Sequence, residues 1–366
     1  MSTIRAEVCV LEDVRPHPNA DALNLGTVKG WQVCLKKDER KTGDPIVYFE
    51  AGTVLPAPLA ERLGVTNYLS NKTDLNGDRV LVVGKVKLRG EPSFGLCIPV
   101  EDAYALDGAG DPEVGDDLAD LYGVIKFRPP VKSSAGDADE DHPHFPAYTD
   151  IENLRNFPDI LTEGEPVVIR EKLHGTNCRV GFVADDFNNP KSVTWMAGSR
   201  ELRRKMPKTD DEIAANTYWF PHALDPVKKL LWALVQEGHN NAVLYGEVYG
   251  GSVQKGFDYG LKRPGFRAFD LLTDGQYVDD AKFEALCEAH GVEVASALYK
   301  GPFTLEVVKQ YASGPAVAGG GHIREGVVVT PAVERNHPQL GRVVLKYVSD
   351  AYLFRKGGDE DDTTDL

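Results

Sequence analysis

The stretch "VVIREKLHGTNCRVGF", residues 167–182, places polar side chains between two short runs of β-prone residues. The flanking runs, 167–169 and 178–182, predict strands, and Gly175 permits a tight turn between them. The polar residues of the turn are Lys172, His174, Thr176 and Asn177. We therefore expect Lys172 to lie at a strand end and to face a cleft.

The composition is that of a globular, acidic protein. The chain has 366 residues, enough for two domains that each bury a core, and 42% of its residues are hydrophobic. The net charge is −15 and the pI is about 5.1, which excludes a uniformly basic protein that coats nucleic acid. Any polyanion must therefore bind to a local basic surface.

The cysteines and the first residues indicate a reducing compartment. Five scattered cysteines without CxxC spacing argue against a disulfide framework and against a zinc site. Residues 1–16 lack a basic segment followed by an apolar stretch, and the chain contains no run of ~18 apolar residues. We expect a soluble, cytoplasmic monomer with no membrane partner.

The order of β-prone and helical segments predicts two different domains. Short β-prone runs separated by Gly, Asn, Asp and Pro fill residues 1–128 and predict a small β-barrel or sandwich. Residues 129–144 are poor in apolar side chains and predict a solvated linker, and the acidic residues 356–366 predict a disordered tail. Residues 145–355 alternate β-prone runs with the helical patterns "DPVKKLLWALVQEG" and "DDAKFEALCEAHG", which predict an α+β domain.

Four later segments each carry one charged or aromatic residue among β-prone neighbours, as strands that line a cleft do. These residues are Glu247 in "VLYGEVYG", Phe269 in "GFRAFDLL", Glu325 in "IREGVVVTP" and Lys346 in "VVLKYVSDAY". Taken singly, each has a structural explanation, since Glu247 can pair with Lys346 and Phe269 can belong to the core. Taken with Lys172 and in this order, they indicate one functional site.

The ordered set resembles the covalent nucleotidyltransferases, the ATP-dependent ligases and capping enzymes whose nucleophilic lysine lies in a K-x-D/H-G element. DNA ligases and capping enzymes usually have Asp at the third place. "EKLHGTN" has His174 there and is similar to the RNA ligase 2 type of RNA ligase. The resemblance covers residues 145–354 and implies an α+β domain with the ATP-grasp-like architecture of ligase adenylation domains.

The first domain carries a second resemblance. "HPNADALNLGTVKGWQVCLKK", residues 17–37, is similar to the OB-fold modules that bind tRNA in some synthetases and to the N-terminal module of Deinococcus-type RNA ligases. An OB barrel before an RNA ligase 2-type domain is the arrangement of that family. The resemblance implies that residues 1–128 bind nucleic acid, with candidate contacts at Lys29, Trp31, Lys36, Lys37, Lys85, Lys87 and Arg89.

The resemblance implies an ATP-dependent RNA ligase that joins 3′-hydroxyl and 5′-phosphate RNA ends at nicks in duplexes. Lys172 would attack the α-phosphate of ATP, expel pyrophosphate and form a lysyl-adenylate. The adenylate would pass to the RNA 5′-phosphate, and the 3′-hydroxyl would displace AMP. The attack needs a neutral amine, which burial, Lys346 and a divalent metal would each favour.

The same resemblance assigns the nucleotide contacts. Lys172 and Lys346 are the catalytic lysines, and Lys346 stabilises charge on the phosphate oxygens. Glu171, Glu247, Phe269 and Lys346 bind the nucleotide. Among these, Phe269 stacks on the adenine and Glu247 takes the ribose hydroxyls.

The remaining assignments concern RNA and metal. His174, Asn177 and Arg200 would contact RNA phosphate or orient the reacting groups. Glu325, with Glu247, would hold a hydrated Mg²⁺ or Mn²⁺, because hard carboxylate oxygens suit these cations.

Two positions depart from the family pattern. RNA ligase 2-type enzymes often have a lysine two places before the last motif's lysine, where this chain has Val344. Many also have a lysine shortly after the metal-binding glutamate, where this chain has Thr330. Phosphate contacts would then be fewer, or would come from Arg342, Lys262 or Arg263.

Two other segments have a structural and a functional explanation. "AVAGGGHIREG" is rich in glycine but lacks P-loop spacing, so it predicts a flexible turn before the Glu325 strand. "RELRRKMPK", residues 200–208, is either a solvated basic face or a place where RNA phosphates bind.

Two alternatives remain open from the sequence. One is a noncatalytic RNA- or tRNA-binding protein with a decayed ligase domain, which the joint presence of Lys172, Glu247, Glu325 and Lys346 argues against. The other is a DNA ligase or a capping-type guanylyltransferase. His174 argues against both, and so does an OB module that precedes the transferase domain rather than following it.

Overall fold

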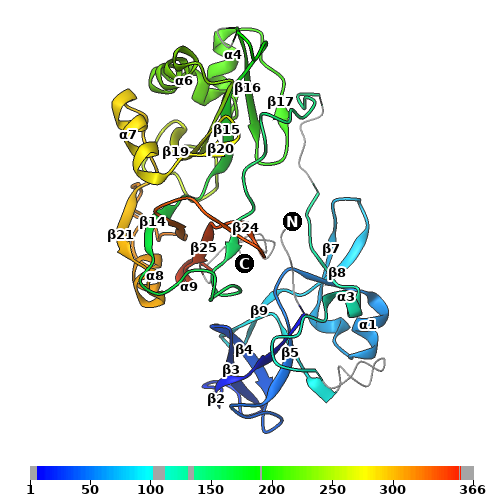
Figure 1. The fold of residues 1–366 in the computed structure, drawn as a ribbon. Helices are drawn as coiled ribbons and strands as arrows, with labels where there is room; N and C mark the ends of the chain where they lie inside the picture. Colours follow the sequence, from blue (N-terminus) through cyan, green and yellow to red (C-terminus); the bar gives the residue numbers. More distant parts are fainter. Residues whose placement is uncertain (1–5, 102–111, 131–135, 190–191, 354, 356–366) are drawn as a thin grey trace. The chain divides into compact units, whose positions relative to one another are not determined.

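The computed structural model describes residues 6–101, 112–130, 136–189, 192–353 and 355. The chain divides into two compact units, one formed mainly by Met1–Lys132 and the other by Ser133–Leu353 (Figure 1). The predicted acidic tail, 356–366, lies outside the described residues, as do residues 131–135 of the predicted linker. The two units are described separately below.

The first unit is built from short strands, as its Gly, Asn and Pro punctuation predicts. The sheets have the strand orders β1-β5-β11, β2-β3-β4, β12-β6-β8-β7 and β10-β9. The strands are β1 Ala6–Val10, β2 Glu12–Pro16, β3 Leu23–Val28, β4 Trp31–Lys36, β5 Pro45–Phe49, β6 Thr53–Leu55, β7 Ser70–Thr73, β8 Arg79–Val82, β9 Lys85–Leu88, β10 Glu91–Phe94, β11 Leu96–Pro99 and β12 Ile125–Lys126. The helical elements are α1 Ala57–Arg62, the 3-10 helix η1 Thr66–Tyr68 and α3 Ala119–Tyr122.

Trp31 and Lys29, predicted to contact nucleic acid, have other partners in this unit. Trp31 begins β4, is 3% exposed and packs on Phe94 with the ring centroids 4.8 Å apart. The Nζ atom of Lys29 forms an ion pair with Oε2 of Glu7 at 2.6 Å. Trp31 is therefore a core residue, and the prediction that it presents its ring to nucleic acid is wrong.

The second unit contains two sheets and their covering helices. Its strands are β13 Glu152–Asn153, β14 Pro166–Lys172, β15 Thr176–Ala184, β16 Val193–Ser199, β17 Arg203–Arg204, β18 Asn241–Tyr249, β19 Gly265–Thr273, β20 Gln276–Tyr277, β21 Ala297–Pro302, β22 Gly326–Pro331, β23 Asn336–His337, β24 Gly341–Arg342 and β25 Leu345–Val348. Its helices are α4 Asp210–Ala215, α5 Phe220–Ala223, α6 Asp225–Glu237, α7 Asp280–His290, α8 Leu305–Ala312 and α9 Asp350–Leu353.

A six-stranded antiparallel sheet, β17-β16-β15-β18-β19-β20, forms one half of this unit. Helices α6 and α7 pack against it (Figure 1), and apolar residues of both, such as Leu230 and Phe283, share a core with Leu244 of β18. Both helices end at a glycine in the left-handed region, Gly238 with φ 90° and Gly291 with φ 73°. The two helices predicted from periodicity are thus confirmed.

A five-stranded sheet, β13-β25-β22-β14-β21, forms the other half. Along β14, β22 and β25 the residues alternate between two faces. One face packs against α8 in a core that includes Ile169, Val327, Leu345 and Val308. The opposite face is left for polar side chains of the same strands.

Residues 137–139 of the predicted linker are bound to the edge of the six-stranded sheet rather than solvated. The backbone N–H of Asp139 donates to the carbonyl of Arg203 at 2.9 Å, and that of Lys205 donates to the carbonyl of Asp137 at 2.8 Å. The side chains of Asp137 and Arg204 form an ion pair at 2.6 Å, as do those of Asp139 and Arg203 at 2.9 Å. We call residues 137–141 the acidic segment.

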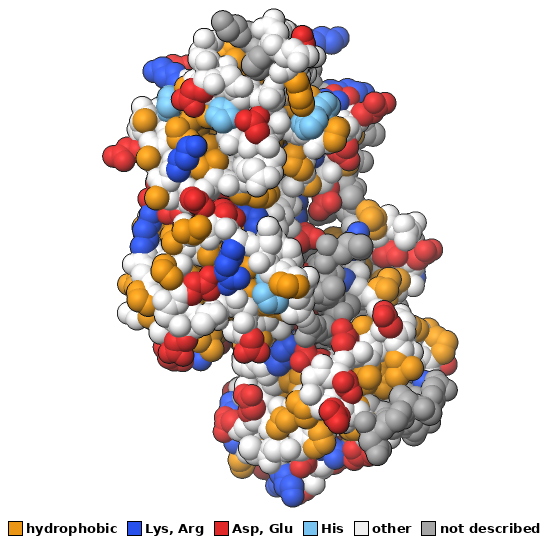
Figure 2. All heavy atoms as spheres, in the orientation of Figure 1, with side chains coloured by type: hydrophobic (Ala, Val, Ile, Leu, Met, Phe, Trp, Pro, Cys, Tyr) orange, Lys and Arg blue, Asp and Glu red, His pale blue; other side chains and the backbone are white. Residues whose placement is uncertain are grey.

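The visible surface of the described residues carries acidic side chains interspersed with basic ones (Figure 2), in keeping with the net charge of −15. Within the described ranges, no helix has the length and apolar character needed to cross a membrane.

His222 in α5 is a buried imidazole, and we expect it to make folding sensitive to acid. Its Nε2 donates to the carbonyl of Met196 at 2.9 Å, and its ring stacks on Trp219. Burial lowers the pKa of His222 from 6.5 to about 4. Between these values the unfolded chain binds a proton that the folded chain does not, so stability falls as pH falls.

The loss from this group should be on the order of 3 kcal/mol between neutral pH and pH ~4. Urea unfolding across this range measures it. The matched variant His222→Gln can still donate to Met196 but does not titrate, so its unfolding free energy should fall less steeply. Parallel pH profiles for the two proteins would contradict the prediction.

Candidate active site

The turn between β14 and β15 places Lys172 at a strand end, as predicted. Lys172 is the last residue of β14 and pairs with Gly326 of β22. Gly175 is required by close approach, because a Cβ atom there would lie 2.3 Å from the carbonyl oxygen of Val248 and 2.9 Å from Cγ of Glu247. The turn therefore lies directly against the strand that carries Glu247.

The two predicted catalytic lysines lie on the same face of the five-stranded sheet. Val328 pairs with Arg170 of β14 and with Lys346 of β25, so these three residues form one row across the sheet. Lys172 follows Arg170 by two residues along β14 and shares its face. This face is opposite to the one that packs on α8.

Glu325 is the direct partner of Lys172. Its side chain is fully buried, and Oε1 accepts a charge-assisted hydrogen bond from Nζ of Lys172, whose side chain is 21% exposed. The other oxygen, Oε2, lies 3.4 Å from Nδ1 of His174. Three residues predicted as site residues are thus brought together.

Two buried oxygens in this region accept no hydrogen bond. They are Oε2 of Glu325 and Oδ1 of Asn177. Asn177 pairs with Glu247 on the neighbouring strand β18. Buried, unsatisfied oxygens of this type suit the waters of a hydrated Mg²⁺ or Mn²⁺. The residues fit a cation held largely through water, since the described residues contain no group of three His, Cys, Asp or Glu that would cage a bare ion.

Phe269 lies on a β-bulge of β19, in the six-stranded sheet. Asp270 pairs with Tyr245 and Ala268 pairs with Gly246, so Phe269 is the extra residue of β19 and has no partner on β18. The ring is half-buried and meets Tyr148 edge-on, with the centroids 5.0 Å apart. A bulge re-aims a side chain, and here it presents an aromatic ring on the sheet that carries Glu247.

Arg342, one suggested source of phosphate contacts, is held in a buried ion-pair network. Its Nη2 lies 2.6 Å from Oδ2 of Asp270, and its guanidinium also binds Glu334. Burial raises the pKa of Asp270 to about 6 although Arg342 opposes the shift, and Tyr148 donates to the carboxylate at 2.8 Å. Arg342 therefore joins β24 to β19. Its guanidinium is already bonded to Asp270, Glu334 and Tyr148, so a phosphate would have to displace one of them.

Glu171 is turned away from Lys172, because neighbouring residues of a strand face opposite sides. Its carboxylate is buried and accepts hydrogen bonds from the backbone N–H groups of Val317 and Ala318 at 2.8 and 2.9 Å. Contact between this carboxylate and a nucleotide would require these bonds to break. In the structure, Glu171 instead holds the loop before Glu325.

We expect Glu171→Gln to destabilise the fold. Glutamine offers one acceptor oxygen in place of two, and its amide group would face a backbone N–H donor. Leaving one buried donor unsatisfied costs about 1–3 kcal/mol. Chemical denaturation measures the loss. The control is Glu306→Gln, which changes an exposed carboxylate on α8. Equal unfolding midpoints for the two variants would show that the loop does not depend on this carboxylate.

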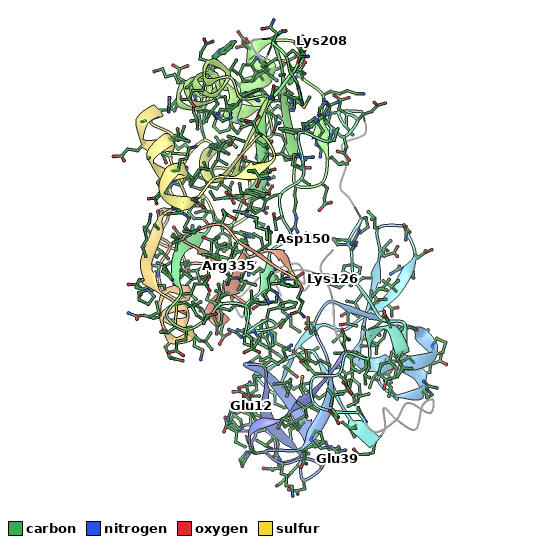
Figure 3. All side chains as sticks on the ribbon, viewed as in Figure 1. Glu12, Glu39, Lys126, Asp150, Lys208 and Arg335 are labelled. Atoms are coloured by element: carbon green, nitrogen blue, oxygen red, sulfur yellow. The ribbon has the colours of Figure 1, made fainter. Side chains whose placement is uncertain are left out.

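Arg200 forms ion pairs of its own in the structure. Its partners are Asp150, which Figure 3 labels, and the neighbouring Glu201. The basic run that begins here is largely neutralised, because Arg203 and Arg204 pair with the acidic segment. The run is therefore not an open basic face in the structure.

Sequence reasoning missed the residues that surround His174. Tyr259 accepts a hydrogen bond from the His174 backbone N–H at 2.8 Å, and Tyr352 lies 3.0 Å from its Nδ1. The ring of Phe257 meets the imidazole edge-on at 4.4 Å. Burial raises the pKa of Tyr259, and the nearby Glu325 acts in the same direction. These aromatics come from a loop and from the last described helix, where no periodic pattern marks them.

Comparison with known proteins decides the family. The family model described as RNA ligase matches residues 165–348, half of the chain. The chain belongs to the RNA ligase family. An OB-fold domain model matches residues 5–100. Both domains of this RNA ligase family member are therefore of the kinds that the two resemblances predicted, an N-terminal OB-fold and a ligase nucleotidyltransferase fold.

Solved structures of an RNA ligase from Naegleria gruberi match almost the whole chain. A mutant form with ATP and Mn has 25% sequence identity and a TM-score of 0.72, and the match covers 95% of this chain and 97% of that one. The form with pyrophosphate has the same identity and coverage with a TM-score of 0.71. A mutant form with AMP and Mn also has a TM-score of 0.71 at 25% identity. No curated protein sequence matches this member of the family.

Proposed function

We propose that this protein is an ATP-dependent RNA ligase that joins 3′-hydroxyl and 5′-phosphate RNA ends at nicks in duplexes. The observation that carries the proposal is the ion pair between Lys172, at the end of β14, and the buried Glu325. The turn that follows Lys172 lies against Glu247. A lysine at a strand end, paired with a buried carboxylate, supports a role in covalent catalysis. Membership of the RNA ligase family supports the same reaction class.

Lys172 would be the nucleophile of the first step. Its Nζ attacks the α-phosphorus of ATP, a P–N bond forms, and the bond to the pyrophosphate oxygen breaks. In the second step the adenylate moves to the 5′-phosphate oxygen of RNA, which frees Lys172. The 3′-hydroxyl then attacks that phosphate and AMP leaves. Lys346, on the same face of the sheet, would stabilise the charge on the phosphate oxygens.

The carboxylate of Glu325 is a partner that would favour the charged form of Lys172 before ATP and metal bind. Bound through Glu325 and Asn177, a divalent cation would engage this carboxylate and supply positive charge beside the amine, which favours its neutral form. Glu325 thus has two oxygens with different tasks, one on Lys172 and one unsatisfied. His174 lies beside the second oxygen and would orient it.

Phe269 and Glu247 would bind the nucleoside. The ring of Phe269 is half-buried on its bulge and offers a face for the adenine, while the Glu247 carboxylate suits the ribose hydroxyls. The Naegleria structures with ATP, AMP and Mn support nucleotide and metal use by this site. Arg200 would contact RNA phosphate after exchanging its partner Asp150.

The OB-fold unit would engage the RNA. We propose residues 1–128 as the RNA-binding module, with 145–355 as the catalytic domain. Lys87 lies on β9 and Arg89 follows it, and both remain candidates for phosphate contact. Trp31 is buried and is no longer a candidate for contact with RNA. Five free cysteines suit a reducing, cytoplasmic location.

The test is incubation with α-labelled ATP followed by nick sealing. A ligase becomes covalently labelled and converts a nicked RNA duplex to a sealed strand, with AMP released. The same nick with a deoxyribose 3′ end tests for a DNA ligase, and competition by GTP tests for a capping-type enzyme. Absence of covalent label with folded protein and Mn²⁺ would overturn the proposal and favour a noncatalytic RNA-binding protein.

A further inference from the structure

Tyr352 lies beyond residue 348, where the family match ends, yet its side chain reaches the turn that carries Lys172. It belongs to α9 and is 1% exposed. Its hydroxyl lies 3.0 Å from Nδ1 of His174, and its ring lies beside Phe257 with the centroids 5.8 Å apart. A buried tyrosine hydroxyl needs a hydrogen-bond partner, and His174 supplies one here.

The backbone fixes Tyr352 relative to Glu325. The N–H of Ser349 donates to the carbonyl of Glu325 at 2.9 Å, and its hydroxyl donates to the carbonyl of Arg324 at 3.1 Å. The same hydroxyl accepts from the N–H of Tyr352 at 3.2 Å. One serine therefore ties the start of α9 to the segment that presents the Glu325 carboxylate.

The surroundings of His174 favour one tautomer. Nδ1 lies between the Tyr352 hydroxyl at 3.0 Å and Oε2 of Glu325 at 3.4 Å. That carboxylate oxygen is buried and accepts no hydrogen bond, so a lone pair on Nδ1 would face it repulsively. A hydrogen on Nδ1 removes the repulsion and can be donated to the Tyr352 oxygen. Nε2 is then left with its lone pair.

We propose that Tyr352 is a positioning residue, whose hydroxyl accepts the hydrogen bond from Nδ1–H of His174 and fixes the orientation of the ring beside the Lys172–Glu325 pair. The expected effect on the reaction rate rests on the proposed function. The hydrogen bond between Tyr352 and His174 does not, and it can be tested without ATP. Tyr352 would act through His174, which lies beside Oε2 of Glu325 and so limits where the carboxylate that holds Lys172 can move.

The kinetic test uses the full chain with Tyr352→Phe, which keeps the ring against Phe257 and removes only the hydroxyl. The rate of adenylate formation at saturating ATP should fall about tenfold, the equivalent of one hydrogen bond, while the ATP concentration for half-maximal rate stays the same. Tyr299→Phe is the control, because that hydroxyl bonds the carbonyl of Pro302 at the exposed edge strand β21. Thermal unfolding must show that both variants are folded.

The second test needs neither ATP nor metal. Nitrogen-15 NMR of labelled histidine reports which ring nitrogen carries hydrogen, and the spectrum of His174→Gln identifies the His174 signals among the nine histidines. In the unsubstituted protein Nδ1 should carry the hydrogen and Nε2 should not. In Tyr352→Phe the hydrogen should stay on Nδ1, because Oε2 of Glu325 still lies beside it, but the ring signals should shift because the bond to the hydroxyl is lost.

The outcomes separate the inference from the proposed function. Hydrogen on Nε2 in the unsubstituted protein overturns the inference, as does an unchanged spectrum or an unchanged rate in Tyr352→Phe. If the unsubstituted protein forms no adenylate at all, the proposed function fails, and the NMR comparison alone decides whether Tyr352 fixes His174.

Discussion

Lys172→Ala is expected to abolish formation of the covalent adenylate and, with it, RNA sealing from ATP. A covalent nucleophile has no substitute here, because Lys346, on the same face of the sheet, would stay protonated to stabilise the phosphate oxygens rather than attack the phosphorus. Lys172→Arg should be equally inactive, because a guanidinium stays protonated and cannot attack. Labelling with α-labelled ATP and gel analysis measures the effect.

The control for this variant is Lys309→Ala. Lys309 lies on α8, outside the turn between β14 and β15, and pairs with Glu306. Its replacement removes one lysine, as Lys172→Ala does, without changing the site. It should label as the unsubstituted protein does. Label retained by folded Lys172→Ala would refute the assignment of the nucleophile, and mapping the labelled peptide would identify the residue that replaces it.

Glu325→Gln is expected to lower the rate of adenylate formation by about 10²–10³-fold, the range seen when one group that stabilises charge at a reacting centre is removed. The substitution keeps the size of this fully buried side chain but removes the negative charge that pairs with Lys172 and that the unsatisfied Oε2 would present to a cation. Affinity for Mn²⁺ should fall in parallel, which electron paramagnetic resonance can follow without ATP.

Glu306→Gln is the matched control, since that carboxylate is exposed on α8. It should leave both the rate and the Mn²⁺ affinity unchanged. If Glu325→Gln binds Mn²⁺ and forms adenylate normally, Glu325 is only the counter-ion of Lys172, and the metal site lies elsewhere.

The strand-end position of Lys172 could be predicted because local rules decide it. Two β-prone runs flank Gly175, which predicts a strand, a turn and a strand from this segment alone, whereas the approach of Gly175 to Val248 is seen only in the structure. The direction of Glu171 could not be predicted. Adjacent strand residues face opposite sides, and only the packing of α8 on one face tells which side is buried.

Trp31 and the run 200–208 were misleading for a different reason. An aromatic ring on a barrel strand suits either the core or a base, and burial against Phe94 depends on the whole barrel. Basic residues look like a phosphate site until their partners are known. Those partners, Asp137 and Asp139, come from a segment more than sixty residues away in the chain.

The support of His174 was beyond sequence reasoning, because it depends on loop conformation. Tyr259 and Tyr352 come from segments in which no helical or strand periodicity shows which side chains face inward. Only the folded chain brings them to one imidazole. The fold class, by contrast, could be predicted, because the motifs around Lys172, Glu247, Glu325 and Lys346 occur in the family's order along the chain.

The acidic segment also protects the molecule from self-association. β17 is the edge strand of the six-stranded sheet, and the bridge of Ala138 with Arg204 occupies its outer hydrogen-bonding groups. A shortened chain that began at residue 145 would expose this edge and leave Arg204 without Asp137. Open strand edges recruit other chains, so such a protein should aggregate even if its catalytic residues are intact. A catalytic fragment that stays dispersed must therefore begin before Asp137.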